Sequence, residues 1–207
     1  MKRILIATDS FLPRWDGIAS FLNVIIPQLK KDYSLAVVAP DFGELKDQDN
    51  VELLRFPTKR FQFADYHPCW PSYRKIREAV KQTDVVWTQT IGPVGAMAII
   101  AARFAKKPVI AYTHSIEWEL VTKSLATKGI LRGLLRGLVR KFAIFMYNRC
   151  SMLMVPSVEV AELLKKSGVS TQKKVIYLGV DTARFVPADK ISAKRNLDIR
   201  PETLVVG

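Results

Sequence analysis

Cysteine and histidine are scarce in this 207-residue chain, which has two of each. Cys69 and Cys150 stand far apart and belong to no metal-ligand spacing or redox motif, so we interpret them as free thiols in a reducing compartment. His67 and His114 do not complete a metal site with them at any standard spacing. We therefore predict no metal ion and no bound cofactor.

Long apolar runs are absent as well. The longest, Val94–Ala102, is much shorter than the ~20 residues that span a bilayer. Only a handful of apolar residues separate the N-terminal Met-Lys-Arg from Asp9, which is too few for a signal peptide. We expect a cytoplasmic protein that is either soluble or attached to the inner face of a membrane.

Two further absences exclude classes of function. The segment that follows the first predicted strand, Asp9–Gly17, has one glycine and is too long for the Gly-x-Gly-x-x-Gly turn of dinucleotide-dependent oxidoreductases. The chain also has no recognisable RNA- or DNA-binding motif. Nucleic acid is therefore not a predicted partner.

Positive charge, in contrast, is abundant. Lysine and arginine number 32 against 19 acidic residues, which gives a net charge of +13. Such a surface favours anionic partners, such as phospholipids or the phosphates of a nucleotide sugar. A solvated basic surface without a specific partner is the alternative.

Short apolar runs alternate with segments of helical periodicity along the chain. This alternation predicts an α/β fold, namely a doubly wound, Rossmann-like, mostly parallel sheet with helices on both faces. The expected strands are Ile4–Thr8, Ser34–Ala39, Val51–Phe56, Asp84–Thr88, Val109–Thr113, Met152–Val155 and Val175–Leu178, and the expected helices are Ile18–Leu29, Tyr73–Val80, Val94–Ala105, Ile130–Tyr147 and Val158–Lys166.

Four segments resemble, in order, the N-terminal half of the family 4 retaining glycosyltransferases, which have the two-domain GT-B fold. They are the loop DSFLPRWDG before a helix, the strand PVIAYTHS that ends in a histidine, the strand–Ser–helix unit MLMVPSVEVAELLKKSGV, and the closing segment KKVIYLGVDTARFVP. The resemblance spans roughly residues 1–187. It implies transfer of a hexose from a nucleotide-sugar donor.

Gly17 and His114 are the main site residues that this resemblance implies. A glycine at a helix start lets an anion approach backbone N–H groups, so the N–H of Gly17 is expected to face the donor diphosphate. His114 is expected to hydrogen-bond the donor sugar near the reacting carbon. The alternatives are an ordinary strand-to-helix turn and a histidine that caps the next segment.

Three further residues are candidates for the acceptor side or the cleft. Asp16 stands where the family commonly has a second glycine, and its carboxylate is unfavourable beside a phosphate unless it points away, for example to an acceptor hydroxyl. Ser115 follows His114 at the same predicted sheet edge. Tyr66 lies in an aromatic stretch that suits either sugar stacking or packing of a loop on the sheet.

A basic amphipathic helix is predicted over Ile130–Tyr147. Its apolar arc is expected to be mostly core, and its basic stripe is expected to face phospholipid. The arc comprises Leu131, Leu134, Leu135, Leu138, Val139, Phe142 and Phe145, and the basic residues of the proposed membrane surface are Lys128, Arg132, Arg136 and Arg140. A helix that simply packs on the sheet is the alternative.

The tail indicates where a second domain begins. We assign residues 1–187 to an N-terminal, acceptor-side domain and residues 188–207 to a linker with a short helix and the first strand, Leu204–Val206, of a donor-binding domain. The two domains are expected to close about Gly179–Pro187. This half alone is expected to transfer little, because the resemblance puts the main donor-binding groups in the other half.

The function that these observations favour is a hexosyltransferase. Its expected partners are a nucleotide sugar, a lipid or glycolipid acceptor and an anionic membrane surface. Two alternatives stay open, a glycosyltransferase with a soluble sugar acceptor and a non-catalytic, anion-binding Rossmann-like module.

Overall fold

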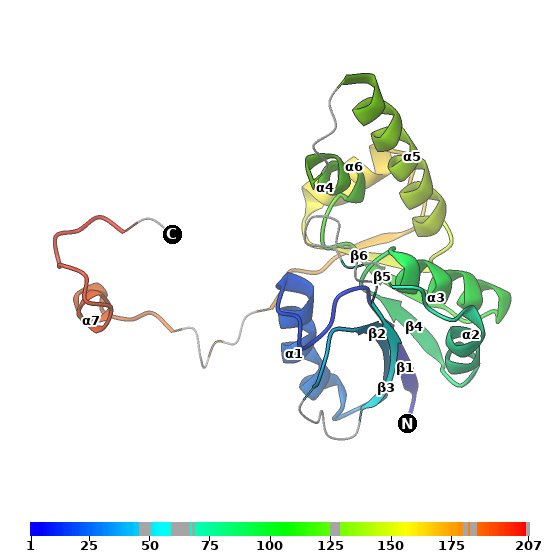
Figure 1. The fold of residues 1–207 in the computed structure, drawn as a ribbon, viewed down its shortest axis with the longest axis horizontal. Coiled ribbons are helices and arrows are strands. Elements are labelled where there is room, and N and C mark those ends of the chain that lie inside the picture. Colours follow the sequence, from blue (N-terminus) through cyan, green and yellow to red (C-terminus); the bar gives the residue numbers. More distant parts are fainter. Residues whose placement is uncertain are drawn as a thin grey trace. The chain divides into compact units, whose positions relative to one another are not determined.

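The computed structural model describes residues 1–45, 51–58, 67, 69–124, 129–179, 182 and 186–205. They fall into two compact units, Met1–Tyr177 and Leu178–Gly207. The first carries the sheet and most of the helices (Figure 1). The second contains the short helix α7, Lys190–Asn196, whose first turn is capped by Asp189 through a 2.8 Å bond from the Ser192 N–H.

Seven parallel strands form one sheet in the order β3-β2-β1-β4-β5-β6-β7. The strands are β1 (Arg3–Ala7), β2 (Ser34–Asp41), β3 (Glu52–Pro57), β4 (Val85–Thr88), β5 (Val109–Tyr112), β6 (Met152–Val155) and β7 (Lys173–Val175). The order reverses direction after β3, which makes β1 and β4 the central pair. Ligands of such sheets collect beyond the carboxyl ends of the strands near this reversal.

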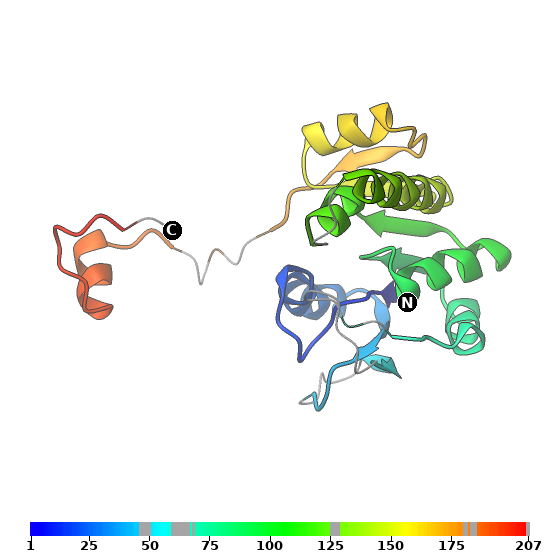
Figure 2. The ribbon, with the colours of Figure 1, turned by 45° about the horizontal axis from the view of Figure 1, so that its top comes forward.

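Within the described part of the first unit, six helices accompany the sheet. They are α1 (Gly17–Leu29), α2 (Tyr73–Lys81), α3 (Pro93–Phe104), α4 (Glu117–Ser124), α5 (Gly129–Tyr147) and α6 (Val158–Lys166). One apolar cluster joins α1 to the sheet, and a second, larger one joins α2, α3, α5 and α6 to it. The predicted α/β sheet with helices on both faces is confirmed: α1 packs on one face, and α2, α3, α5 and α6 pack on the opposite face (Figure 2).

The last strand lies earlier in the chain than predicted. Residues Lys173–Val175 form β7 instead of Val175–Leu178, because β7 pairs with Leu153–Val155 and this partner strand ends there. A hydrogen bond from Ile176 N to Val155 O closes the pairing. In the second unit, the described residues Leu204 and Val205 form no strand, and Val206 lies outside the described residues.

Helix α4 was not predicted from the sequence. Its eight residues lack an apolar stripe, which is the pattern that reveals a helix in a sequence. The acidic Glu119 in its first turn favours a helix start here, because its negative charge interacts favourably with the positive end of the helix dipole.

The prediction that the apolar arc of α5 is mostly core is wrong. Leu131 and Leu134 are each 60% exposed and Leu138 is 58% exposed, and Phe142 and Phe145 are exposed too. The helix reaches the core through its C-terminal half, where Ala143, Met146 and Tyr147 are buried and Val139 and Ile144 pack against the core. Most of this long helix therefore presents large apolar side chains to solvent.

Candidate functional site

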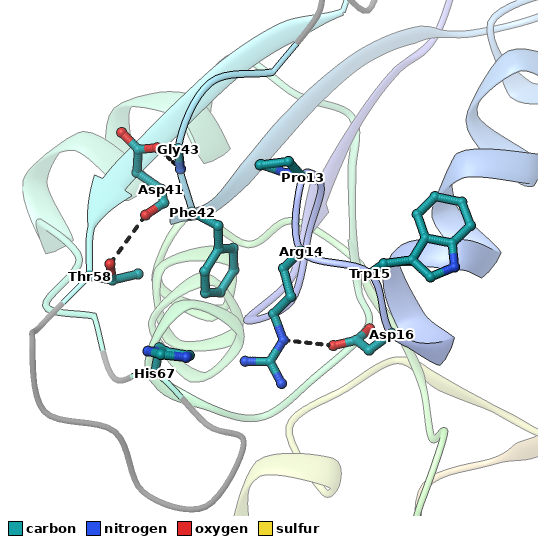
Figure 3. Close-up of a pocket in the computed structure, with 9 residues that line it drawn as sticks. All are labelled: Pro13, Arg14, Trp15, Asp16, Asp41, Phe42, Gly43, Thr58 and His67. Atoms are coloured by element: carbon teal, nitrogen blue, oxygen red, sulfur yellow. Dashed lines mark hydrogen bonds and ion pairs between the residues drawn. The ribbon is translucent and has the colours of Figure 1, made fainter.

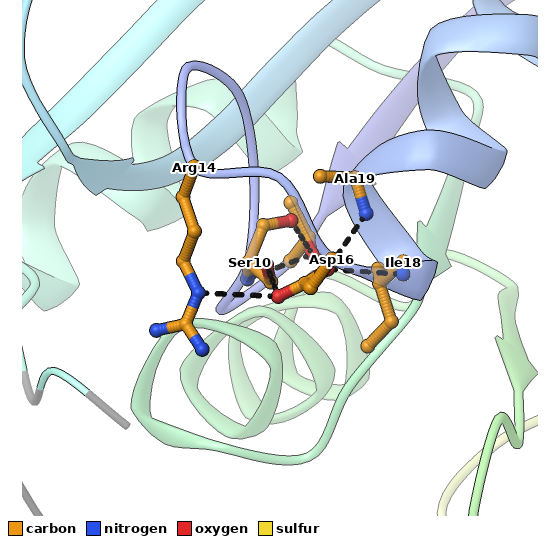
Figure 4. A network of polar contacts seen from close by, with 6 residues as sticks. Ser10, Arg14, Asp16, Ile18 and Ala19 are labelled. Carbon is orange, nitrogen blue, oxygen red and sulfur yellow. Dashed lines mark hydrogen bonds and ion pairs between the residues drawn. The ribbon is translucent and has the colours of Figure 1, made fainter. Parts of the chain in front are cut away.

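The loop between β1 and α1 ends in an aspartate that caps the helix (Figure 4). Asp16 has an extended backbone, and its Oδ1 accepts hydrogen bonds from the N–H groups of Ile18 and Ala19, each at 3.0 Å. Its Oδ2 accepts from the Ser10 hydroxyl and pairs with Arg14 Nε at 3.2 Å. This carboxylate thus has four donors, about as many as its lone pairs can serve.

Gly17 is the first residue of α1, so the helix begins one residue before the predicted start at Ile18. A Cβ placed on it would meet no atom within 4 Å, so the space beside its backbone is open. The neighbouring first-turn donors are already satisfied by Asp16. A ligand anion at this helix end would therefore meet the Gly17 backbone together with a resident carboxylate, whose charge Arg14 offsets.

A second carboxylate, which is buried, fills the N-terminus of α3. Asp9 accepts from Val94 N at 2.8 Å, from Gly95 N at 3.2 Å and from the Thr90 hydroxyl at 2.5 Å. The pKa of Asp9 is raised, because the effect of burial is larger than the opposing effect of these hydrogen bonds. Gly92 makes the contact sterically possible, because a Cβ there would lie 2.6 Å from the Asp9 carboxyl group.

His114 follows β5 at the same sheet edge as the start of α1. Its ring lies 4.5 Å from that of Tyr112 and 5.5 Å from that of Phe21, which is one turn into α1. Gly17 and His114 therefore share one edge and one side of the sheet. Burial lowers the pKa of His114 to about 4, against a smaller opposing influence of Asp16, so the imidazole is neutral at pH 7.

Gln89 contacts His114 and was missed in the sequence. It follows β4, and its backbone N–H extends the sheet through a 2.8 Å bond to Ala7 O. Its side-chain Oε1 lies 2.9 Å from His114 Nε2. The available signal was its position, directly after a strand that neighbours the one leading to His114.

A cavity of about 730 Å³ lies on the β2 and β3 side of the β1–α1 loop (Figure 3). Arg14 lies over the ring of Phe42, with its guanidinium carbon 5.6 Å from the ring centre, and His67 meets the same ring edge-on at 6.1 Å. Asp41 pairs with Arg55 at 2.6 Å. The lining residues are Pro13, Arg14, Trp15, Asp16, Asp41, Phe42, Gly43, Thr58 and His67.

The other predicted site residues are placed as follows. Asp16 lines this cavity, although its carboxylate is held as the cap of α1. Ser115 is partly buried directly after His114. Tyr66 and Lys128 lie outside the described residues.

The basic residues of α5 are exposed, but two of them make contacts within the protein. Arg136 forms an ion pair with Glu119 of α4, and Arg140 donates to the Ser167 carbonyl at 3.3 Å. Arg132 is exposed on the same helix. The predicted basic stripe therefore exists on the surface, with part of its charge balanced.

The first residue of α4, Glu117, has a buried carboxyl group. Burial raises the pKa of Glu117 to about 7 in spite of a hydrogen bond donated by the Tyr147 hydroxyl. Among the described residues, Glu117 Oε2 is buried and has no hydrogen-bond partner.

Within the described ranges, no group of three or more histidine, cysteine or acidic residues is arranged to hold a metal ion. The helices described there include none with the length and apolar character needed to cross a bilayer.

The geometry can now be compared with known proteins. The family model of Glycosyltransferase Family 4 matches residues 15–184, which include α1, the strand before His114 and the strand–helix unit of β6 and α6. This chain belongs to Glycosyltransferase Family 4.

Two curated proteins resemble this Family 4 chain along most of its length. It is 27% identical over 188 residues to the alpha-monoglucosyldiacylglycerol synthase of Streptococcus pneumoniae, with 88% of this chain and 42% of the relative covered. It is 24% identical over 193 residues to the GDP-mannose-dependent alpha-(1-6)-phosphatidylinositol monomannoside mannosyltransferase of Mycolicibacterium smegmatis, with 89% and 46% covered. The chain thus spans less than half the length of these relatives.

Among solved structures, the sucrose-phosphate synthase of Thermosynechococcus elongatus has a similar fold. The TM-score is 0.60 at 12% identity, and the match covers 97% of the Family 4 chain and 53% of the synthase. At this level of identity the likeness concerns the fold alone, which is that of a GT-B glycosyltransferase domain.

Proposed function

We propose that this Family 4 domain is the acceptor-side half of a retaining glycosyltransferase that transfers a hexose from a nucleotide sugar to a lipid-linked acceptor at a membrane surface. The observation that carries the proposal is the family match over residues 15–184. The two curated relatives support the lipid acceptor, since their names specify products or acceptors built on diacylglycerol and phosphatidylinositol.

The donor is proposed to bind along the edge that Gly17 and His114 share. Asp16 satisfies the N–H groups of Ile18 and Ala19, so the diphosphate would approach α1 at Gly17, where the space is open. His114 is neutral and partly buried, which suits a hydrogen bond to a sugar hydroxyl. In this arrangement the protein positions the donor and stabilises the charge of the leaving diphosphate, with no protein nucleophile.

The acceptor head group is proposed to occupy the cavity beside Arg14 and Phe42. The cavity combines an aromatic ring, a guanidinium group and the partly exposed carboxylate of Asp41, which is the mixture of apolar and polar groups that orients a ligand with hydroxyl groups. Asp16 lines the cavity and also influences the pKa of His114, which supports a path from the cavity to His114. The acceptor would thus reach the reacting carbon past the start of α1.

Membrane attachment is proposed to occur through the exposed side of α5. This surface combines Leu131, Leu134 and Leu138 with the exposed Arg132. Large apolar side chains that are rimmed by basic ones bind the head-group region of an anionic leaflet, and each basic residue near the leaflet contributes about 1 kcal/mol. The enzyme would therefore act at the inner face of the cell membrane.

A transfer assay with the complete enzyme tests the reaction. Radiolabelled UDP-hexose and GDP-hexose donors are offered with diacylglycerol, phosphatidylinositol, a glycolipid or a soluble glucoside, and the anomeric configuration of the product is read by NMR. We expect transfer to a lipid acceptor with retention of configuration. Transfer only to the soluble glucoside would refute the lipid acceptor, and no transfer from any donor would contradict the proposed enzyme.

Liposome co-sedimentation tests the membrane surface. The protein should sediment with vesicles that contain anionic phospholipid and stay in solution with purely zwitterionic ones. Replacing Leu134 and Leu138 by serine should reduce binding severalfold. The matched control is Leu163→Ser, which removes an exposed leucine from α6 and should bind normally. Equal loss in both variants, or indifference to anionic lipid, would refute attachment through α5.

A further inference from the structure

The side chain of Gln89 is buried next to the ring of His114. Only 1% of Gln89 is exposed, although it lies at the sheet edge where the site forms. Its Oε1 is 2.9 Å from His114 Nε2, and its Nε2 is a buried atom without a hydrogen-bond partner among the described residues. A buried primary amide without its full set of partners costs folding free energy, so a role other than stability is needed to explain this residue.

The orientation of the Gln89 amide decides which ring nitrogen of His114 carries the proton. A carbonyl oxygen can only accept a hydrogen bond, so Gln89 Oε1 requires a hydrogen on His114 Nε2. A neutral imidazole has one N–H, and its Nδ1 is then a lone-pair acceptor. The opposite orientation of the amide would place its NH₂ group on Nε2 and move the proton to Nδ1, which reverses the roles of the two ring nitrogens.

We propose that Gln89 is a positioning residue that holds His114 in the Nε2–H tautomer, so that His114 Nδ1 accepts a hydrogen bond from a hydroxyl group of the donor sugar. The role of Nδ1 rests on the proposed function, whereas the tautomer does not. His114 is then a fixed acceptor and takes no part in proton transfer. The rings of Tyr112 and Phe21 restrict its rotation, and Asp16 is the charged group that influences it.

Imidazole NMR of the ¹⁵N-labelled protein tests the tautomer directly. The chain has two histidines, so His67→Gln assigns both sets of signals. At pH 7 we expect His114 in the Nε2–H form alone. In Gln89→Leu the two tautomers should both be populated, whereas Gln89→Glu keeps an oxygen acceptor and should preserve the Nε2–H form while it raises the pKa of His114. The control Gln28→Leu, an exposed glutamine of α1, should leave the His114 signals unchanged.

Two NMR results would overturn the proposal. One is a His114 that carries its proton on Nδ1 in the unmodified protein. The other is a Gln89→Leu variant, shown to be folded by its methyl spectrum, in which His114 keeps the pure Nε2–H form. Neither depends on whether the enzyme transfers sugar.

Steady-state kinetics of the complete enzyme test the consequence for catalysis. Gln89→Leu should lower kcat by about three- to tenfold, the effect of one misplaced hydrogen bond, with a smaller change in the KM for the donor. Gln89→Glu should recover most of the loss at high pH, where His114 is neutral again. Equal kcat in Gln89→Leu and the unmodified enzyme would refute the positioning role. If the unmodified enzyme transfers no hexose, the proposed function fails while the NMR result still decides the tautomer.

Discussion

Helices α3 and α5 are both apolar, yet the sheet buries one and leaves most of the other in solvent. In α3 seven residues are buried, and all of them are glycine, alanine, valine or isoleucine. In α5 the leucines are large, alternate with arginines, and remain exposed over most of the helix. Small side chains let α3 approach the sheet closely. The long leucines and arginines of α5 instead form a surface that faces away from the sheet. Apolar content alone therefore does not identify the core.

Glycine substitutions should separate the two helices most strongly. A Cβ on Gly95 of α3 would lie 1.9 Å from the Thr90 carbonyl oxygen, so Gly95→Ala should lower the free energy of unfolding by about 3 kcal/mol. A Cβ on Gly137 of α5 would meet nothing within 4 Å, so Gly137→Ala should raise it by about 1 kcal/mol through helix propensity. Urea unfolding measures both. Similar changes in the free energy of unfolding for both variants would contradict the proposed difference between α3 and α5.

The buried acid next to α5 should make stability depend on pH. Burial raises the pKa of Glu117 from 4.5 to about 7, so the folded state holds this proton more tightly than the unfolded state. The free energy of unfolding therefore falls as pH rises from about 4.5 to about 7. Glu117→Gln should be more stable than the unmodified protein at pH 8, by an amount on the order of 3 kcal/mol, and about equal to it at pH 4.

Thermal unfolding at the two pH values checks this difference. The control is Glu159→Gln, at an exposed acid whose pKa is lowered by a hydrogen bond from Ser157, so this variant should gain nothing at pH 8. A Glu117→Gln variant with the same gain at pH 4 and pH 8 would contradict the assigned proton.

The buried acid next to α3 should behave differently, because it has backbone donors. Asp9 accepts from Val94 N and Gly95 N, and an asparagine would leave one of these buried N–H groups without an acceptor. Asp9→Asn should lower the free energy of unfolding by about 2 kcal/mol in a urea titration. Asp189→Asn, at the exposed cap of α7, should leave it nearly unchanged because asparagine caps helices equally well. A stable Asp9→Asn would show that the cap of α3 is dispensable.

The smallest effect is expected at the ion pair between α4 and α5. Arg136 and Glu119 are both substantially exposed, and exposed pairs contribute less than about 1 kcal/mol. Arg136→Gln should lower the free energy of unfolding by this amount at most, and 0.5 M salt should remove the difference. A larger decrease in the free energy of unfolding would mean that the Arg136–Glu119 ion pair contributes more to the position of α5 than the core contacts of Tyr147 do.

Much of the fold could be predicted from the sequence because buried parallel strands are short apolar runs of the kind seen at Ile4–Ile6. The failures have physical causes. The limits of β7 depend on where β6 ends, and the exposure of α5 depends on how far the helix extends beyond the sheet; neither is a local property. For the site, chain order places Gly17 and His114 at one edge, but the contact of Gln89 with His114 joins residues 25 positions apart and needs coordinates.

The capped start of α1 has a consequence for the protein before any substrate arrives. Asp16 supplies an acceptor to the N–H groups of Ile18 and Ala19, so a bound phosphate is not needed to satisfy these two groups. A nucleotide therefore gains no affinity from pairing with these two N–H groups. The affinity for a nucleotide has to come from protein groups that are not already paired with other groups of the protein.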